Sequence, residues 1–196
     1  AEITPVTISS RRGDVVVDAD EHPRAGLTLE KLAGMRPVFK KDGTVTAGNA
    51  SGINDGAAML VLTRLSVAKE RGLTPLAELV DFTKVGIEPG IMGYAPKPAI
   101  EKILERNGLS KDDIGWYEIN EAFAAQALPV SRDLDLDPAK VNPLGGAIAW
   151  GHPIGATGAI ISMRTIENIR KTDLEWGLAS MCIGGGQAVA SLWRRL

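Results

Sequence analysis

The spacing of apolar residues changes along this chain near Leu76. Before that point, apolar residues occur in short groups between polar and glycine-rich stretches, which is typical of a loop-rich region. Within this region the pattern predicts two short strands, in residues 2–8 and 14–19, and a short helix in residues 28–35 with Thr28 as its N-cap.

A continuous apolar run, Ala57–Thr63, follows a loop that is dense in Gly, Asn and Ser. A run of this length without polar alternation predicts a strand that is buried on both faces. The residues that come next, 64–72, predict a helix that ends at Gly72.

From Leu76 onwards, strand-like and helical patterns alternate. The predicted strands are 76–87, 116–120, 140–144, 176–183 and 187–196, and the predicted helices are 96–108, 121–134 and 155–171. Pro129 is expected to kink or split the second of these helices. The order βαβαβα followed by two strands predicts an α/β fold with a mostly parallel or mixed sheet that is covered by helices.

Two of the predicted helices carry an apolar stripe that is expected to face the sheet. The stripe of the first helix consists of Ala99, Ile100, Ile103 and Leu104, and that of the last consists of Ala156, Ile160, Met163, Ile166 and Ile169.

The composition mainly excludes classes of protein. The net charge is −2 and the basic residues are scattered, which argues against a nucleic-acid-binding domain. No apolar run approaches the ~20 residues that cross a bilayer. One cysteine permits no intramolecular disulfide, and two histidines without metal-ligand spacing predict no metal site. A reducing, cytoplasmic location is therefore expected, with the mitochondrial matrix left open.

Three polar side chains stand where predicted strands end or loops turn into helices: Asn120, His152 and Cys182. Ligands of open α/β sheets gather beyond the carboxyl ends of the strands. Each residue also has a purely structural explanation, as a helix N-cap, a satisfied loop histidine and a small buried hydrophobe. The consecutive glycines Gly184–Gly186 favour a ligand site, since glycines weaken a sheet unless their N–H groups must approach a ligand.

These three groups fit the chemistry of a carbonyl compound. A thiol can exchange a proton with a carbon atom or a leaving thiol, and an imidazole can activate a second nucleophile or donate to an oxyanion. An amide can hold a water molecule that donates to the same oxygen, and glycine N–H groups can serve a second oxyanion.

Three segments carry a resemblance to a known family: NEAFAAQ (120–126), GGAIAWGHPIGATGA (145–159) and CIGGG (182–186). In this order and spacing they resemble the motifs of the thiolase family, and among its members most closely those of the acetyl-CoA acetyltransferases. The resemblance runs through nearly all of the chain and includes residues 20–26 and 43–58.

The resemblance implies a role for each of the four catalytic candidates. Cys182 is implied to be the general acid/base that takes a proton from the acyl carbon and returns it in the reverse direction. His152 is implied to activate the nucleophilic thiol and to form one oxyanion hole with a water held by Asn120. The backbone N–H of Gly184 is implied to belong to a second oxyanion hole.

The resemblance also implies how coenzyme A thioesters bind; these are substrates, and no cofactor is expected. Ser51 and Ala47 would lie along the pantetheine arm, and Arg24 near the nucleotide end. The pocket around the thioester would be lined by Phe39, Met92 and Phe123.

The family uses a second cysteine, the nucleophile, and this chain has only Cys182. We therefore expect the chain to be the C-terminal half of a thiolase, with the nucleophile supplied by the N-terminal half. Residues 1–53 would be part of the loop domain that binds coenzyme A, 54–74 the last strand and helix of the N-terminal domain, and 75–196 the C-terminal domain. A homodimer or homotetramer of the complete enzyme is expected.

Two alternatives remain open. A degradative 3-ketoacyl-CoA thiolase of broader chain length would use the same residues, and Trp150 stands where the family usually has a smaller residue, which leaves the substrate size open. A non-catalytic module that binds acyl-CoA would need the pocket but no acid/base thiol.

Overall fold

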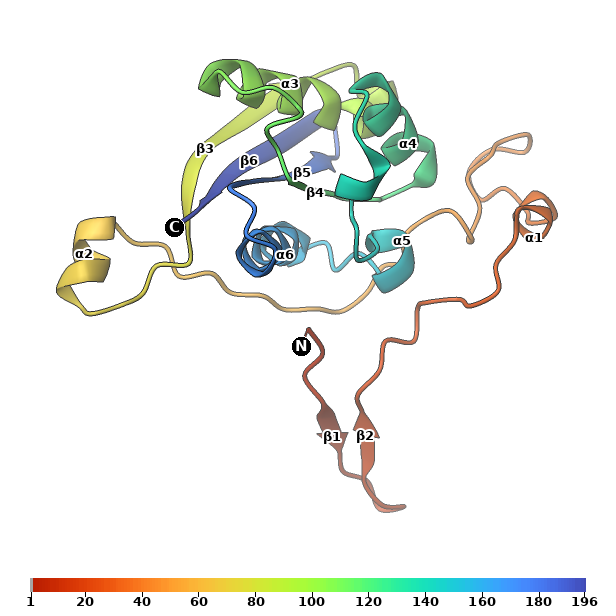
Figure 1. The fold of residues 1–196 in the computed structure, drawn as a ribbon. Coiled ribbons are helices and arrows are strands. Elements are labelled where there is room, and N and C mark those ends of the chain that lie inside the picture. Colours follow the sequence, from red (N-terminus) through yellow and green to blue (C-terminus); the bar gives the residue numbers. More distant parts are fainter. Residues whose placement is uncertain (1) are drawn as a thin grey trace.

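The computed structural model describes residues 2–196. Its N-terminal part is a two-stranded antiparallel hairpin, β1 (Val6–Ile8) and β2 (Val15–Val17), which projects from the body (Figure 1). The helix α1 (Leu29–Ala33) follows, and its N-cap Thr28 accepts a hydrogen bond from the Lys31 N–H, as the sequence predicts. Both strands and this helix are shorter than predicted, but they lie where the pattern places them.

A four-stranded mixed sheet forms the body of the protein. Its strands are β3 (Ala77–Gly86), β4 (Trp116–Ile119), β5 (Trp176–Ile183) and β6 (Gln187–Arg195). They lie in the order β3-β6-β5-β4, with β4 parallel to β5 and the other pairs antiparallel. The α/β class and the mixed sheet are therefore confirmed.

Helices cover the two faces of this sheet (Figure 1). The helices α3 (Pro96–Asn107) and α4 (Ala124–Asp133) lie on one side, and α6 (Thr157–Lys171) lies on the other. The shorter elements are α2 (Leu65–Glu70), η1 (Pro89–Tyr94), η2 (Pro138–Lys140) and α5 (Ala147–Trp150). None of the helices in residues 2–196 is long and apolar enough to cross a membrane.

Successive side chains along each strand point to opposite faces of the sheet, so the buried residues form one cluster on each face. The larger cluster joins the predicted stripe of α3 to the sheet through Leu178 and Leu192, both fully buried. The smaller cluster joins α6 to the other face through Trp116 and Trp193. Glycine at position 177 leaves room for α6, since a Cβ there would lie 2.5 Å from a methyl carbon of Thr165.

The predicted strand Ala57–Thr63 is wrong. These residues have no regular secondary structure, and Met59 and Val61 are each 84 % exposed. The physical reason is pairing, because no strand of the described residues lies beside this run to hydrogen-bond with its backbone. Without a neighbouring strand, most of the apolar side chains of this run stay exposed to solvent.

Three smaller expectations also differ from the structure. Residues 140–144 form no strand, and Val141 makes only an isolated bridge to Tyr117. The helix α4 runs through Pro129 without being split, although this proline stands inside the helix, where it removes one backbone donor. In α6, Met163 is exposed and Ile161 takes its place against the core.

Replacing Ile103 with Ala tests the importance of the α3 cluster. Ile103 is fully buried in the larger core cluster, so its truncation should lower the free energy of unfolding by about 2–5 kcal/mol. The matched control is Leu128→Ala on the exposed side of α4, which should change it by less than about 0.5 kcal/mol. Urea denaturation followed by circular dichroism gives both values, and similar losses in the two variants would contradict this view of the core.

Candidate active site

The site begins where β4 ends. Asn120 directly follows β4, and its backbone N–H continues the pairing with β5 by donating to the Ser180 carbonyl at 2.9 Å. Its side-chain Nδ2 lies 3.4 Å from Nε2 of His152. Two of the three predicted catalytic side chains, from segments far apart in the sequence, are therefore in contact.

The hydrogen bonds of His152 define which ring nitrogen carries the proton. The Thr157 hydroxyl donates to the Pro153 carbonyl at 2.9 Å, so its oxygen accepts from His152 Nδ1, which lies 2.7 Å away. The proton of the neutral ring is then on Nδ1, and Nε2 presents a lone pair toward the Asn120 amide. Burial lowers the pKa of His152, which favours this neutral form.

Asn120 has an unused hydrogen-bonding atom. The residue is 2 % exposed, and its Oδ1 is the one buried side-chain nitrogen or oxygen among residues 2–196 that has no hydrogen-bond partner. A buried acceptor without a partner is costly and usually marks a place for water or a ligand. The position next to the His152 ring makes this atom suited to hold a water molecule there.

Cys182 lies near the end of β5, the parallel neighbour of β4. It is 8 % exposed, and burial raises the pKa of its thiol. The topology thus places the thiol and Asn120 at the carboxyl ends of adjacent parallel strands. No hydrogen bond joins the Cys182 Sγ to Asn120 or His152 within the described part of the chain.

A segment from the N-terminal part of the chain holds the His152 loop. The His152 N–H is shared between the Gly52 carbonyl at 3.1 Å and Asn54 Oδ1 at 3.2 Å. Gly151 before it has φ +102, and a Cβ there would lie 2.3 Å from Asn54 Oδ1, so only glycine fits. The glycine-rich region 48–56 therefore serves backbone contact with the site.

The triple glycine is the turn between β5 and β6. Gly185 and Gly186 both have positive φ, and a Cβ on Gly186 would lie 2.3 Å from the Ile87 carbonyl oxygen. The turn itself thus requires two of the three glycines. The Gly184 N–H takes part in none of the hydrogen bonds found among residues 2–196, and its role in an oxyanion hole stays a prediction.

The residues predicted to bind coenzyme A fall into two groups. Arg24 and Ala47 line one cavity of about 610 Å³, which Glu121 and Gly146 also line. Phe39 and Phe123 meet edge to face, with ring centroids 5.7 Å apart.

The other two candidates lie on segments that touch the start of α4. Ser51 lies beside the same turn as Phe123, since its N–H donates to the Ala122 carbonyl at 3.0 Å. Met92 lies half-buried on η1, which contacts α4 through a hydrogen bond from Gln126 to the Gly93 carbonyl.

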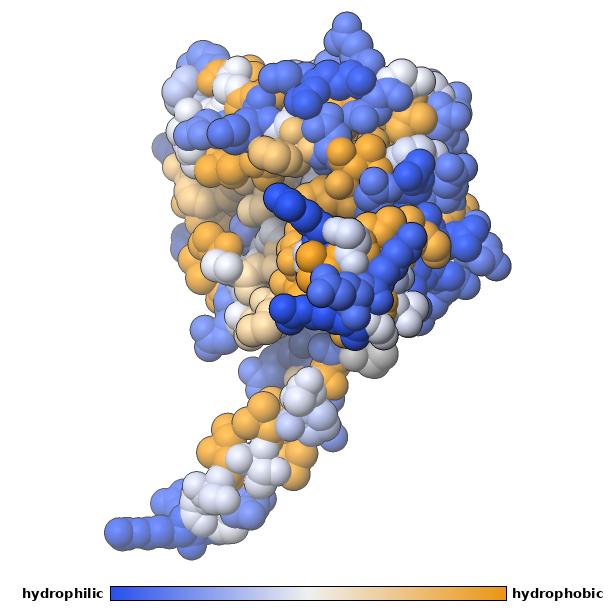
Figure 2. All heavy atoms as spheres, turned by 90° about the vertical axis from the view of Figure 1, so that its left-hand side faces the viewer, coloured by the Kyte–Doolittle hydropathy of each residue, from blue (hydrophilic) through white to orange (hydrophobic). Residues whose placement is uncertain are grey.

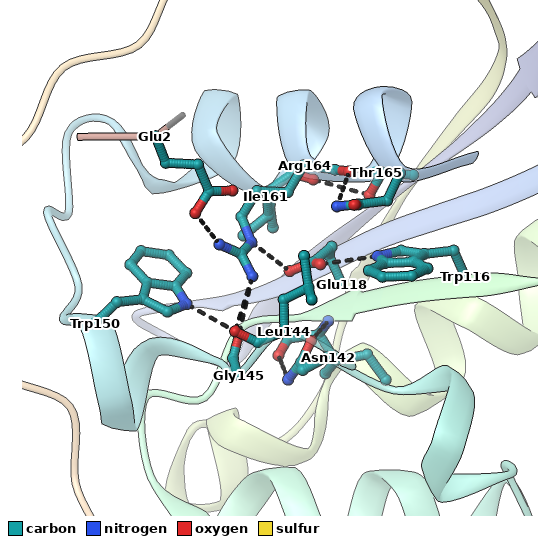
Figure 3. A network of polar contacts seen from close by, with 12 residues as sticks. Glu2, Trp116, Glu118, Asn142, Leu144, Gly145, Trp150, Ile161, Arg164 and Thr165 are labelled. Carbon is teal, nitrogen blue, oxygen red and sulfur yellow. Dashed lines mark hydrogen bonds and ion pairs between the residues drawn. The ribbon is translucent and has the colours of Figure 1, made fainter. Parts of the chain in front are cut away.

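A buried ion pair underlies the site (Figure 3). Glu118, 1 % exposed, accepts from Arg164 Nε at 3.2 Å and from Trp116 Nε1 at 2.8 Å. Burial raises the pKa of this carboxyl, and Arg164 partly offsets the rise. Arg164 also donates to the Gly145 carbonyl at 3.1 Å and lies over the Trp150 ring, so it ties α6 and β4 to the segment that leads to His152.

Sequence reasoning missed several residues that support the site: Glu118, Glu121, Asn142, Thr157 and Arg164. A local signal existed for two of them, the Asn-Pro turn at Asn142 and the helix start at Thr157. The others act through contacts between distant segments. No group of three or more His, Cys, Asp or Glu side chains in residues 2–196 could hold a metal ion.

The sequence of this α/β protein was compared with models of known protein families. The model of the thiolase N-terminal domain matches residues 1–66, and that of the thiolase C-terminal domain matches residues 73–195. The chain belongs to the thiolase family.

Curated thiolases are similar in sequence to this chain over its whole length. The acetyl-CoA acetyltransferase of Allochromatium vinosum is 54 % identical over 196 residues, which is 100 % of this chain and 50 % of that protein. Beta-ketothiolase BktB of Cupriavidus necator is 49 % identical over the same 196 residues, again 50 % of its length. The chain thus spans about half the length of the curated relatives it matches.

Solved structures give the same result. The Bacillus anthracis acetyl-CoA acetyltransferase superposes with a TM-score of 0.92 at 53 % identity and covers 98 % of this chain and 49 % of its own. Human mitochondrial 3-ketoacyl-CoA thiolase in complex with CoA gives a TM-score of 0.85 at 44 % identity, covering 92 % of this chain and 46 % of its own. Both similarities extend over nearly all of this chain and about half of the solved chain.

The reactivity of the single cysteine tests its environment. Burial shields Cys182 and raises its pKa, so iodoacetamide should alkylate it at pH 8 at least about tenfold more slowly than in the same chain unfolded in urea. Intact-mass spectrometry measures both rates. Equal rates for the folded and the unfolded chain would show that the thiol is open to solvent and carries its ordinary pKa.

Proposed function

We propose that this chain forms part of an acetyl-CoA C-acetyltransferase, which condenses two acetyl-CoA molecules to acetoacetyl-CoA and CoA and catalyses the thiolytic reverse. The observation that carries the proposal is the contact of Asn120 with His152, beside a buried amide oxygen without a partner. Membership of the thiolase family and similarity to proteins named acetyl-CoA acetyltransferase support it.

His152 is suited to move the proton of the nucleophile. Its unprotonated Nε2 takes the proton of the attacking cysteine thiol while the sulfur bonds to the thioester carbonyl carbon and CoA leaves as its thiolate. The ring then carries a proton on Nε2 and can donate it in a hydrogen bond to the oxygen of the second thioester. A water held by Asn120 would donate to the same oxygen and stabilise the enolate.

Cys182 is proposed to be the general acid/base that exchanges a proton with the reacting carbon atom of the substrate. In the thiolytic direction the thiol, whose pKa is raised by burial, gives its proton to the enolate carbon that leaves the acyl group. In the condensation the thiol first gives its proton to the CoA thiolate that leaves the first acetyl-CoA, and the resulting Cys182 thiolate then takes a proton from the methyl carbon of the second acetyl-CoA. Gly184 N–H is proposed to contact the oxygen of the acyl-enzyme.

The cavity beside Arg24 and Ala47 is proposed to bind coenzyme A. Glu121 lines this cavity and directly follows Asn120 in the chain, so a pantetheine arm passing Ser51 would bring a thioester to the site. The aromatic pair of Phe39 and Phe123, together with Met92, would bound the acyl group. No cofactor is needed for these steps.

The nucleophilic cysteine is proposed to come from the polypeptide that corresponds to the other half of the relatives. An uncovered apolar groove of about 280 Å³ supports such a partner, because it is lined by Leu62, Leu79 and Phe82 beside α6. Phe82 is 59 % exposed, and apolar residues also line the projecting hairpin (Figure 2). Large exposed apolar surfaces of this kind mark interfaces. We further propose a homodimer or homotetramer of the complete enzyme.

A degradative thiolase of broader chain length is the second candidate. It is favoured by the similarity to human mitochondrial 3-ketoacyl-CoA thiolase, and the same residues would perform the chemistry. A module that only binds acyl-CoA is a third candidate, but binding alone would not need the buried thiol at the end of β5.

Reconstitution tests the proposal. This chain, co-expressed with the polypeptide that carries the nucleophilic cysteine, should cleave acetoacetyl-CoA faster than longer 3-ketoacyl-CoA substrates. Cys182→Ser should lower kcat by about 10²-fold or more, since acid/base groups contribute about 10²–10⁴ in rate, while CoA binding measured by calorimetry is retained.

Other outcomes select among the candidates. Unchanged turnover in Cys182→Ser would refute the catalytic role of the thiol. Faster turnover of long substrates would favour the degradative enzyme, and CoA binding without turnover would favour the binding module.

A further inference from the structure

The residues on both sides of Asn120 are fastened to the segment that leads into His152. Ile119 precedes Asn120 and Glu121 follows it, and both form hydrogen bonds with residues 142–148. Four residues later along the chain stands His152. The contact between Asn120 and His152 therefore depends on how this segment is attached.

The first attachment is the side chain of Asn142. Its Oδ1 accepts from the Ile119 N–H and its Nδ2 donates to the Ile119 carbonyl, each at 2.9 Å, so one buried amide replaces a neighbouring strand at this point. Its own N–H donates to the Tyr117 carbonyl at 2.9 Å. The backbone of Asn142 has φ +45, a conformation that asparagine tolerates better than most residues.

The second attachment is the carboxylate of Glu121. One oxygen accepts from Asn142 Nδ2 at 3.1 Å, and the other accepts from the Ile148 N–H at 3.2 Å. Gly146 leaves the room for it, since a Cβ there would lie 2.2 Å from the carboxyl carbon. The φ of Gly146 is −115, so space and not backbone conformation requires glycine at this position.

We propose that Glu121 and Asn142 are positioning residues that set the spacing between Asn120 and His152, and with it the geometry of the oxyanion hole. The inference rests on the proposed function of that pair. Glu121 acts through Asn142 and Ile148, which hold the start and the end of the segment against the Asn120 turn. It need not contact the reacting atoms to affect the rate.

The spacing is sensitive because the contact is already long. At 3.4 Å between Nδ2 and Nε2, a shift of a few tenths of an ångström takes the pair out of hydrogen-bond range. An oxyanion hole works only if both donors reach the same oxygen at about 2.7–3.1 Å. A loosened segment would therefore lower the turnover rate more than it weakens the binding of substrate.

The experiment uses the complete enzyme and three variants: Glu121→Gln, Asn142→Ala and Gly146→Ala. Glutamine keeps the size of Glu121 but places an NH₂ group against one of the two donors, and the alanine at position 146 displaces the carboxylate. Glu105→Gln, an exposed change on α3, is the matched control.

Each of the three variants should lower kcat about tenfold or more, which is less than the about 10²–10³ for loss of a whole oxyanion donor. The KM for acetoacetyl-CoA should stay within about threefold in Asn142→Ala, since Asn142 does not line the proposed coenzyme A cavity, and the melting temperature of Glu121→Gln should match that of Glu105→Gln. A crystal structure of Glu121→Gln should show the Nδ2–Nε2 separation increased beyond 3.5 Å.

The outcomes separate this inference from the proposed function. If Cys182→Ser abolishes turnover but Glu121→Gln and Gly146→Ala leave kcat unchanged, the positioning role is overturned. If Cys182→Ser itself remains active, the proposed function fails. The separation in the crystal then decides the positioning role alone, and an unchanged 3.4 Å contact overturns it.

Discussion

The contact between the Asn120 amide and the His152 ring joins two segments that are 32 residues apart in the chain, and the arrangement of the site depends on it. Neither residue could reach the other without the parallel pairing of β4 and β5, which fixes where Asn120 emerges from the sheet. The Thr157 hydroxyl orients the ring from the other side. The glycine-rich region around Gly52 then closes the loop over His152.

The buried pair of Glu118 and Arg164 supports this arrangement at a cost in desolvation. Such pairs contribute little net stability, because removing both charges from water offsets most of their attraction. Here the pair joins β4 to α6, and Arg164 adds hydrogen bonds to the backbone that approaches His152. The specific geometry, more than stability, explains a carboxylate in a strand whose four residues are all buried.

Local patterns in the sequence were enough to predict the α/β class, most of the helices and strands, and the positions of Asn120 and Cys182 at strand ends and of His152 in a loop before a helix. The stop of α3 at Gly108 and the cap at Thr28 are short-range effects, so they could be predicted from neighbouring residues. Ala57–Thr63 could not, because a buried strand needs a partner strand. Glu121 and Asn142 escaped notice because their partners are distant in the sequence.

The most direct test of the joint action of Asn120 and His152 is a double-mutant cycle in the complete enzyme. It compares kcat/KM for acetoacetyl-CoA in Asn120→Ala, His152→Ala and the double variant. If the two side chains serve one oxygen, the kcat/KM of the double variant should be only slightly lower than that of the less active single variant. The coupling free energy should then be about 2 kcal/mol or more. Independent losses that add in free energy would contradict the view that the two groups form one site.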